Sequence, residues 1–367
     1  MKITRLWLVN FRNYENAVLE FADNTLLVGL NGAGKTNVLE AVDILATSRS
    51  KIVKGLNKCI RHGQAGFAIS GNFAAAGEFT VAFRQERDAD RTVKINDETL
   101  ARTSELLGKV NSVIFLPGDL ELIHGTPAAR RKYLDLVISQ TEKDYYQDLQ
   151  VYTRALKQRN ELLKNLRYAD ASDGERSRTA RDFTVWETQL AETGARIMQK
   201  RREILDFFAG ETARLYNEMG FSGTLSLRYK TDVTSDCQAN LEALAAARAD
   251  DIRLRRTHFG THADDFEFHL DNNKAAEFCS QGQQRLIALA CKCAEAKLKN
   301  QKLADPPIVL VDDVLLELDL ERLNKIITAI APDSQKIFTV TDTGRFSADI
   351  LRGMKVIKIE NGRVMPL

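Results

Sequence analysis

The chain opens with alternating apolar and polar residues, a pattern that predicts β-strands. The alternation covers residues 3–9 and 17–21, and the short apolar run of residues 25–28 follows it. A period of two is the spacing of side chains on one face of a strand. The run stops at Gly29, and the segment NVLEAVDILA after Thr36 has apolar residues at helical spacing. This region therefore predicts a strand, a glycine loop and a helix in succession.

Two further regions carry strand signals. Residues 67–100 contain short alternating runs (FAISGNF, FTVAFRQE and RTVKIND) broken by glycine and Asn-Asp, which predicts a small antiparallel sheet. Towards the C-terminus, alternating strands and helices predict a parallel α/β core. The expected elements there are a strand near 225–229, an Ala-rich helix at 241–248, the strand DDFEFHLD, a helix at 283–298, the strand IVLV (308–311), a helix after Leu320, the strand KIFTVT and the hairpin MKVIKIENGRV.

The middle of the chain has helical periodicity and no proline between Pro127 and Pro306. Heptad-like apolar spacing covers residues 149–166 and 183–207, with the polar segment YADASDGERSRTARD between them. We expect either an antiparallel helical hairpin or a short bundle, because Arg159 and Lys200 fall on positions that the pattern would make apolar. The predicted organisation is a body formed by residues 1–128 and 222–367, with a helical arm, residues 129–221, inserted into it.

Composition describes an ordinary globular protein of about two domains. The chain has 367 residues, 44% of them hydrophobic, with 52 Lys and Arg against 50 Asp and Glu. The resulting net charge of +2 argues against a protein whose whole surface binds polyanions, although a local basic groove remains compatible with it. Disorder, collagen and a small disulfide scaffold are excluded.

The N-terminal sequence and the cysteines bear on the compartment. No run reaches about 18 consecutive apolar residues, and Arg5, Arg12 and Glu15 interrupt the N-terminus too early for a signal peptide. The five cysteines form an odd set without a CxxC pair, so neither disulfides nor a zinc cage is expected. We expect a cytoplasmic protein that does not bind or cross a membrane.

The glycine loop fits the pattern GxxxxGKT between an apolar strand and a helix, the context in which it predicts a phosphate-binding P-loop. Backbone N–H groups and the helix N-terminus would bind a phosphate chain, Lys35 would reach the β- and γ-phosphates, and Thr36 would ligate Mg²⁺. The alternative is a plain glycine turn before a helix. The predicted loop consists of Gly29, Leu30, Asn31, Gly32, Ala33, Gly34, Lys35 and Thr36.

Two adjacent carboxylates follow the apolar strand IVLV. The end of a buried parallel strand is where P-loop proteins place the carboxylate of their metal site. Asp312 is therefore predicted to hold Mg²⁺ together with Thr36, and Asp313 to polarise the attacking water as general base. The alternative is a surface turn, in which two neighbouring carboxylates would repel each other.

The segment CSQGQQR, residues 279–285, leads directly into a predicted helix. This segment follows the P-loop and precedes the acidic strand end, and at that place in the chain it resembles the SxGQ signature of ABC-type ATPases. In that family the signature of one subunit contacts ATP bound to the other subunit. The resemblance implies a homodimer closed by ATP, with contacts from Ser280, Gly282 and Gln283.

Along essentially its whole length the chain resembles the RecF family of bacterial DNA replication and repair ATPases, which belongs to the SMC-like, ABC-type ATPases. The resemblance is carried by ITRLWLVNFRNYENAVLEF, GLNGAGKTNVLEAV, SVIFLPGDLELIHGTPAARRKYLDLVIS, LKQRNELL, RRTHFGTHADDFEF, SQGQQR and VDDVLLELD. It implies a P-loop head with a mixed sheet flanked by helices, formed by 1–128 and 222–367, and an inserted helical arm, 129–221. It also implies catalytic roles for Lys35, Asp313 and Ser280, and an Arg12 that closes over the nucleotide. A plain surface arginine is the alternative for Arg12.

Three positions depart from the family pattern. Leu316 stands where serine is usual, Thr261 replaces the proline of a Gly-Pro-His motif, and no histidine follows the strand IFTVT at the switch position of transporter ATPases. The first departure bears on the dimer contact. The last, together with the long insert before the signature, favours the repair family over the nucleotide-binding subunit of an ABC transporter, which is the alternative function.

The resemblance implies an ATP-dependent clamp that dimerises on duplex DNA near single-strand gaps and is released by slow, DNA-dependent ATP hydrolysis. It further implies a nucleoid-associated role in recombinational gap repair, loading of the RecA recombinase and the SOS response, with RecO and RecR as partner proteins. Clustered basic residues are candidates for contacts to the phosphates of duplex and gapped DNA, with ordinary solvated helix faces as the alternative. These candidates are Arg130, Arg131, Lys132, Arg154, Lys157 and Arg159.

Overall fold

The computed structural model describes residues 1–87, 89–165, 173–312, 333–344 and 348–365. Their contacts divide the chain into two compact units, each formed by discontinuous segments. The head unit comprises Met1–Leu120, Glu211–Ser222 and Arg285–Leu367, and the helical unit comprises Glu121–Gly210 and Gly223–Gln284. This division differs from the boundaries expected from the sequence, because Gly223–Gln284 groups with the helical unit.

An antiparallel sheet in the head unit arises from the alternating N-terminal sequences. Its strand order is β2-β1-β4-β5-β6-β7, and the predicted small sheet over residues 67–100 supplies its last four strands. Buried apolar side chains alternate with half-buried or exposed residues along much of β1 and β4, so one face of this sheet is buried and the other is more accessible. The strands are β1 (Lys2–Phe11), β2 (Tyr14–Glu20), β4 (Gly66–Ala74), β5 (Glu78–Glu86), β6 (Thr92–Ile95) and β7 (Glu98–Thr99).

The second sheet of the head unit is mixed, with strand order β15-β14-β3-β13-β12-β8. All neighbours pair in parallel except β14 and β15, which form the C-terminal antiparallel hairpin. This arrangement confirms the predicted α/β core with a mixed sheet. The strands are β3 (Asn24–Val28), β8 (Ser112–Phe115), β12 (Ile308–Val311), β13 (Lys336–Val340), β14 (Lys355–Glu360) and β15 (Arg363–Met365).

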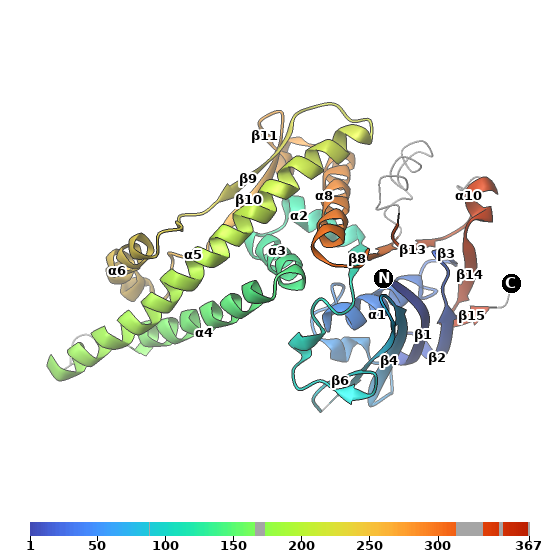
Figure 1. Cartoon of the computed structure of the whole chain (residues 1–367), viewed down its shortest axis with the longest axis horizontal. Coiled ribbons are helices and arrows are strands. Elements are labelled where there is room, and N and C mark those ends of the chain that lie inside the picture. The colour runs from blue at the N-terminus through green and yellow to red at the C-terminus, as the bar shows by residue number, and fades with distance from the viewer. Residues whose placement is uncertain (88, 166–172, 313–332, 345–347, 366–367) are drawn as a thin grey trace. The chain divides into compact units, whose positions relative to one another are not determined.

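Helix α1 (Lys35–Thr47) contacts strands of both sheets and forms the centre of the head core (Figure 1). Its apolar residues at helical spacing, among them Val38, Leu39 and Val42, are fully buried. Burial of that many large side chains is the main stabilising term for this unit. Short elements complete it: the 3₁₀ helices Leu56–Cys59, Thr103–Leu106 and Pro117–Leu120, and helix α10 (Ala348–Arg352).

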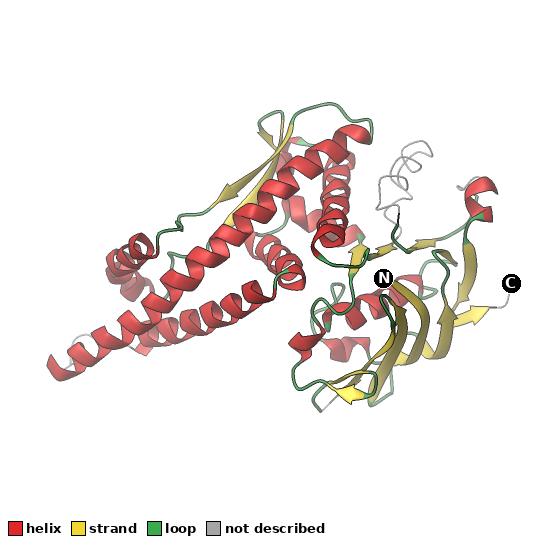
Figure 2. Cartoon of the chain, viewed as in Figure 1, coloured by secondary structure: helices red, strands yellow, loops and turns green. Residues whose placement is uncertain are grey.

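Helices dominate the helical unit (Figure 2). The ion pairs Asp148–Arg196 and Arg159–Glu187 follow opposite orders along α4 and α5, so these helices are antiparallel. Helix α5 begins at Asp173, inside the polar segment that the sequence suggested as a connection. The helices are α2 (Glu121–His124), α3 (Pro127–Thr141), α4 (Lys143–Asn165), α5 (Asp173–Glu218), α6 (Cys237–Leu254), α7 (Ala275–Phe278) and α8 (Gln281–Lys302); α5 ends, and α8 continues, in the head unit.

A three-stranded sheet explains why Gly223–Gln284 belongs to the helical unit. It consists of β9 (Leu225–Lys230), β10 (Asp265–Leu270) and β11 (Asn273–Lys274). Strand β10 packs on α3, and Asp265 at its start forms a two-bonded ion pair with Arg130 of α3. The segment is therefore tied to α3 by side-chain charges that lie far apart in the sequence.

Candidate nucleotide-binding site

The predicted phosphate-binding loop lies between β3 and α1. Gly32 and Gly34 have positive φ values of 79° and 117°, a backbone region that residues with a Cβ rarely adopt. A Cβ on Gly34 would also come within 2.8 Å of the Asn13 side chain. Glycine is thus required at position 34, where the loop turns into the N-terminus of α1. A loop and helix N-terminus of this kind direct backbone N–H groups at an anion.

Lys35 closes the loop on itself. Its buried ammonium donates to the carbonyl oxygens of Gly29 at 2.7 Å and Leu30 at 3.2 Å. Leu30 itself is 79% exposed, and Asn31 is exposed beside it, so the outer side of the loop is accessible. Phosphate oxygens carry negative charge and would be stronger acceptors for this ammonium than the two neutral carbonyls.

The hairpin between β1 and β2 supports the loop, a role that the sequence reasoning missed. Asn13 Nδ2 donates to the carbonyl of Ala33 at 2.9 Å, and the buried Tyr14 hydroxyl donates to the carbonyl of Gly34 at 3.1 Å. Asn37 Nδ2 in turn donates to Asn13 Oδ1 at 2.9 Å. Burial raises the pKa of Tyr14, so its hydroxyl stays protonated and remains a donor. The only sequence signal was a pair of polar residues between two strands, which also fits an ordinary turn.

The P-loop threonine and the acidic strand end meet at the carboxyl edge of the parallel strands. Thr36 Oγ1 lies 2.8 Å from Asp312 Oδ1 and 2.9 Å from Oδ2. Asp312 is 5% exposed. The two residues are separated by 276 positions in the chain, and the parallel order of β3, β13 and β12 brings them together.

This donor set fits Mg²⁺. A hydroxyl and an adjacent carboxylate are the hard oxygen ligands that Mg²⁺ prefers, and it commonly uses only one or two protein ligands besides water and phosphate. Thr36 and Asp312 are the described residues that would hold it. Asp313, the predicted general base, lies outside the described residues, as does Leu316.

Arg12 is held by an acidic residue of α1. Its guanidinium forms two hydrogen bonds of 2.7 Å to the Glu40 carboxylate, which is almost completely buried. A third bond reaches the carbonyl of Lys58 at 3.2 Å. The backbone φ of Arg12 is +53°, in the left-handed region, and its backbone N–H donates to the carbonyl of Cys59 at 2.7 Å. The structure thus gives Arg12 a partner within the chain, and any nucleotide contact would require release from Glu40.

The signature segment caps the N-terminus of α8. Ser280 Oγ accepts from the backbone N–H of Gln283 at 3.2 Å, while the Gln283 side chain accepts from the backbone N–H of Ser280 at 2.9 Å. This reciprocal pair is a capping box. Ser280 and Gly282 are exposed. Gln284 Nε2 donates to three carbonyl oxygens of the α7 region, which fixes the approach to the helix.

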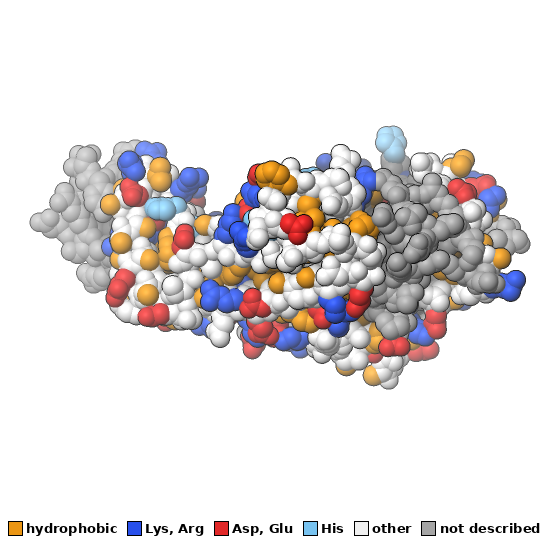
Figure 3. All heavy atoms as spheres, turned by 90° about the horizontal axis from the view of Figure 1, so that it is seen from above, with side chains coloured by type: hydrophobic (Ala, Val, Ile, Leu, Met, Phe, Trp, Pro, Cys, Tyr) orange, Lys and Arg blue, Asp and Glu red, His pale blue; other side chains and the backbone are white. Residues whose placement is uncertain are grey.

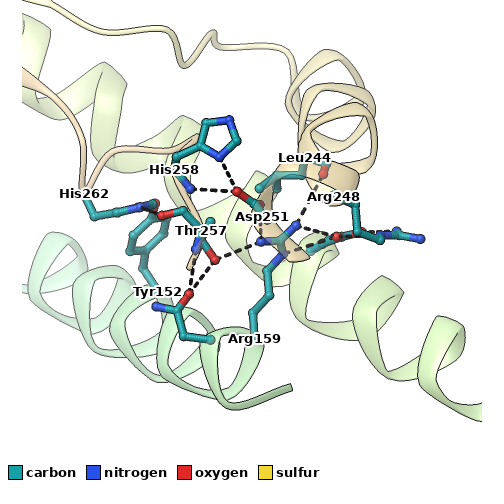
Figure 4. Close-up of polar contacts among 10 residues, drawn as sticks. Tyr152, Arg159, Leu244, Arg248, Asp251, Thr257, His258 and His262 are labelled. Carbon is teal, nitrogen blue, oxygen red and sulfur yellow. Dashed lines mark hydrogen bonds and ion pairs between the residues drawn. The ribbon is translucent and has the colours of Figure 1, made fainter. Parts of the chain in front are cut away.

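Arg159 corrects one of the predicted DNA contacts, because its side chain is 0% exposed. Its guanidinium donates to Asp251 at 2.5 Å, to Glu187 at 2.9 Å and to Thr257 Oγ1 at 2.8 Å (Figure 4). Arg248 also pairs with Glu187. Buried charges persist in proteins when they are paired and hydrogen-bonded in this way. Arg159 therefore joins α4, α5 and α6 inside the helical unit and cannot reach a phosphate from this position.

Arg130 is a second correction. It is 5% exposed and donates to both oxygens of Asp265 and to the carbonyl of Gly125. Arg131 is half-buried, with Nη1 bound to the carbonyl of Asp264 at 2.6 Å. Of the six predicted basic contacts, the exposed ones are Lys132, Arg154 and Lys157.

Charges of both signs are mixed on the surface. On the face drawn in Figure 3, the described Lys and Arg side chains alternate with Asp and Glu instead of forming one continuous basic area. Among the described residues, no group of three or more His, Cys, Asp or Glu side chains is arranged to hold a metal ion. The described helices include none that is long and apolar enough to span a membrane.

A family model named RecF/RecN/SMC N terminal domain matches residues 2–364 of the chain. Among curated relatives, the DNA replication and repair protein RecF of Synechococcus sp. (strain JA-3-3Ab) is 36% identical, covering 100% of this chain and 97% of the relative. The protein with the same name from Rippkaea orientalis (strain PCC 8801 / RF-1) is 35% identical, and the match covers 100% of both chains.

Solved structures give the same result. The recombination mediator protein RecF with ATP, from the RecFOR pathway, has a TM-score of 0.89 and 28% identity, covering 100% of this chain and 97% of that one. An Smc head bound to the C-terminal winged-helix domain of ScpA has a TM-score of 0.56 at 16% identity, covering 100% and 98%, which shows a shared fold. These whole-length matches do not support the alternative of a transporter subunit.

Proposed function

Because the chain belongs to the RecF/RecN/SMC N-terminal domain family, and within it to the RecF proteins, we propose that it is an ATP-dependent DNA-binding clamp of the RecF type. The proposed binding of ATP rests on one observation: the Thr36 hydroxyl lies within 2.9 Å of the Asp312 carboxylate, next to a loop that Gly32 and Gly34 shape. A similar RecF chain has been solved with ATP, which supports the same ligand here.

The P-loop would bind ATP through its backbone N–H groups and the N-terminus of α1. Lys35 would exchange the carbonyls of Gly29 and Leu30 for the β- and γ-phosphates. Thr36 and Asp312 would hold Mg²⁺, which when bound neutralises charge on those phosphates. Asp313 would accept a proton from the attacking water, so that the ATP is slowly hydrolysed to ADP and phosphate.

A second copy of the chain would complete the site. The exposed N-terminus of α8 presents Ser280 and Gly282, and its helix dipole favours an anion. The side chain of Gln283 is engaged in the capping box and would contribute chiefly by keeping Ser280 in place. Closure around ATP would therefore depend on both copies, and Arg12 would contact the nucleotide only after leaving Glu40.

The DNA-binding part rests on fewer side chains than the sequence suggested. Lys132, Arg154 and Lys157 are exposed in the helical unit and are the remaining candidates for phosphate contacts, together with the half-buried Arg131. The relatives are DNA replication and repair proteins, and one is a recombination mediator of the RecFOR pathway. We therefore propose a cytoplasmic role in gap repair, RecA loading and the SOS response, with RecO and RecR as partners.

The test is light scattering of the purified chain with ATP and Mg²⁺, with and without plain and gapped duplex DNA. We expect a dimer only with ATP, and tighter DNA binding in that state. Lys35→Ala should lose ATP binding, whereas Ser280→Arg should keep ATP binding and lose dimer formation. A wild-type chain that stays monomeric with ATP, or binds DNA equally with and without it, would refute the clamp.

A further inference from the structure

A buried hydroxyl contacts the carboxylate of the metal site from a neighbouring strand. Thr339 of β13 is 3% exposed, and its Oγ1 donates to Asp312 Oδ1 at 2.6 Å. This is shorter than either distance from Thr36 to the same carboxylate. Hydrogen bonds that end on an ionised acceptor are stronger than those between neutral groups.

The sheet order places Thr339 at this point. Strand β13 lies between β3, which leads into the P-loop, and β12, which ends at Asp312. Phe338 pairs with Val311, so the next residue of each strand, Thr339 and Asp312, lies at the same level. The backbone N–H of Asp312 is bound to the carbonyl of Phe115 in β8 at 2.9 Å. Asp312 is therefore held through its main chain on one side and its side chain on the other.

The bond to Asp312 accounts for a hydroxyl-bearing residue at this buried strand position. All five residues of β13 are buried, and the neighbours Phe338 and Val340 are apolar. A valine would have the same shape and β-branching as threonine and would avoid burying a hydroxyl, which is unfavourable unless the hydroxyl is hydrogen-bonded. The bond to Asp312 compensates that burial.

Only one of the two threonines that contact Asp312 is also a predicted Mg²⁺ ligand. Thr36 has a single hydroxyl hydrogen for the two carboxylate oxygens, and its oxygen is also the predicted Mg²⁺ ligand. Thr339 belongs to a strand interior and fixes one oxygen, Oδ1, independently of the P-loop. The second oxygen of Asp312 is then oriented whether or not Thr36 turns to the metal.

We propose that Thr339 is a positioning residue, whose hydroxyl holds Oδ1 of Asp312 so that the carboxylate is preorganised for Mg²⁺. This rests on the proposed binding of ATP with Mg²⁺ by the P-loop. Thr339 does not contact the nucleotide in this scheme and acts on the metal through Asp312. Its loss should therefore change the metal requirement of ATP binding more than ATP binding itself.

The experiment is calorimetric titration of the full chain with ATP at several Mg²⁺ concentrations and in EDTA. Thr339→Val removes the hydroxyl at constant shape, and we expect it to raise the Mg²⁺ concentration needed for half-maximal ATP affinity roughly tenfold. Affinity in EDTA should stay within about twofold of wild type, and Thr339→Ser should restore the metal requirement. Thr339→Ala, which also lacks the hydroxyl, replaces the valine variant should that one not fold.

Thr25→Val is the matched control. Thr25 is a fully buried threonine at the opposite end of the same sheet, and its hydroxyl bonds only to the backbone of Ala22 among the described contacts. It should alter stability without altering the Mg²⁺ requirement. If Thr339→Val and wild type need the same Mg²⁺ concentration, or if Thr25→Val shows the same shift, the positioning role is wrong. If the wild type does not bind ATP at all, the proposed function itself has failed.

Discussion

Replacing Arg159 with methionine is expected to destabilise the helical unit by about 3–5 kcal/mol, the range measured when one partner of a buried ion pair is removed. Methionine keeps the length and much of the volume of the side chain, so the change isolates the charge and its hydrogen bonds. The perturbed groups are buried: Glu187 is 1% and Asp251 0% exposed.

Removal of the Arg159 guanidinium affects its two carboxylate partners, Glu187 and Asp251, unequally. Glu187 keeps Arg248, which pairs with it through two nitrogens. Asp251 keeps the backbone N–H of His258 at 3.1 Å and the His258 ring, but Oδ2 loses the 2.5 Å bond from Arg159. Asp251 is thus the carboxylate left with the larger uncompensated charge. Adding Asp251→Asn, which removes that charge and keeps an acceptor for His258, should recover part of the loss.

Urea unfolding measures this effect with an internal reporter. The chain has two tryptophans, Trp7 in the head unit and Trp186 in the helical unit, so a Trp7→Phe background makes fluorescence report on the helical unit. Arg154→Met on the exposed side of the same helix is the matched control and should change stability by less than about 0.5 kcal/mol. If Arg159→Met is no more destabilising than this control, or if adding Asp251→Asn brings no recovery, the charge network does not stabilise the unit.

Two further predictions concern titratable groups. Burial raises the pKa of Cys59 and of Cys293 to about 12 each, whereas Cys237 is exposed. We therefore expect a thiol reagent at pH 8 to modify Cys237 first, and Cys237→Ser to remove this fast phase of labelling. Fast labelling of Cys59 in the native chain would contradict the fold. Burial lowers the pKa of His262 below its usual 6.5, so the unfolded chain binds the proton more tightly and stability should fall as the pH drops below about 6.5. His262→Gln should reduce the dependence of the unfolding free energy on pH, measured by urea unfolding, by up to about 1.4 kcal/mol per pH unit. An unchanged pH dependence would refute this role of His262.

The nucleotide site could be anticipated from the sequence because its parts are local or follow from strand order. The P-loop is a continuous pattern, and two of its glycines, Gly32 and Gly34, have the positive φ that the turn requires. Asp312 follows a buried apolar strand, and parallel strands place their carboxyl ends at one edge. The supporting contacts of Asn13, Tyr14 and Thr339 could not be anticipated, because each depends on which backbone or side chain lies opposite it in three dimensions.

The buried arginines, in contrast, could not be predicted from the sequence. A charged residue on a helix is normally exposed, and nothing in the vicinity of Arg159 identifies its partners, which are 28 and 92 positions away. One signal was present: Arg159 occupies a position that the heptad pattern assigns to an apolar residue. The mismatch weakens a coiled-coil prediction, and the structure explains it by a buried arginine that is paired with two carboxylates.

This use of arginine changes the meaning of the near-zero net charge. Arg130, Arg159 and Arg201 are each at most 5% exposed and each pairs with carboxylates of the helical unit. Their charges are neutralised inside the unit and contribute little to the field at its surface. A count of basic residues therefore overstates the charge available to a phosphate backbone. In the proposed clamp, DNA contact would depend on exposed residues such as Lys132, Arg154 and Lys157, and doubling them in a dimer would matter correspondingly more.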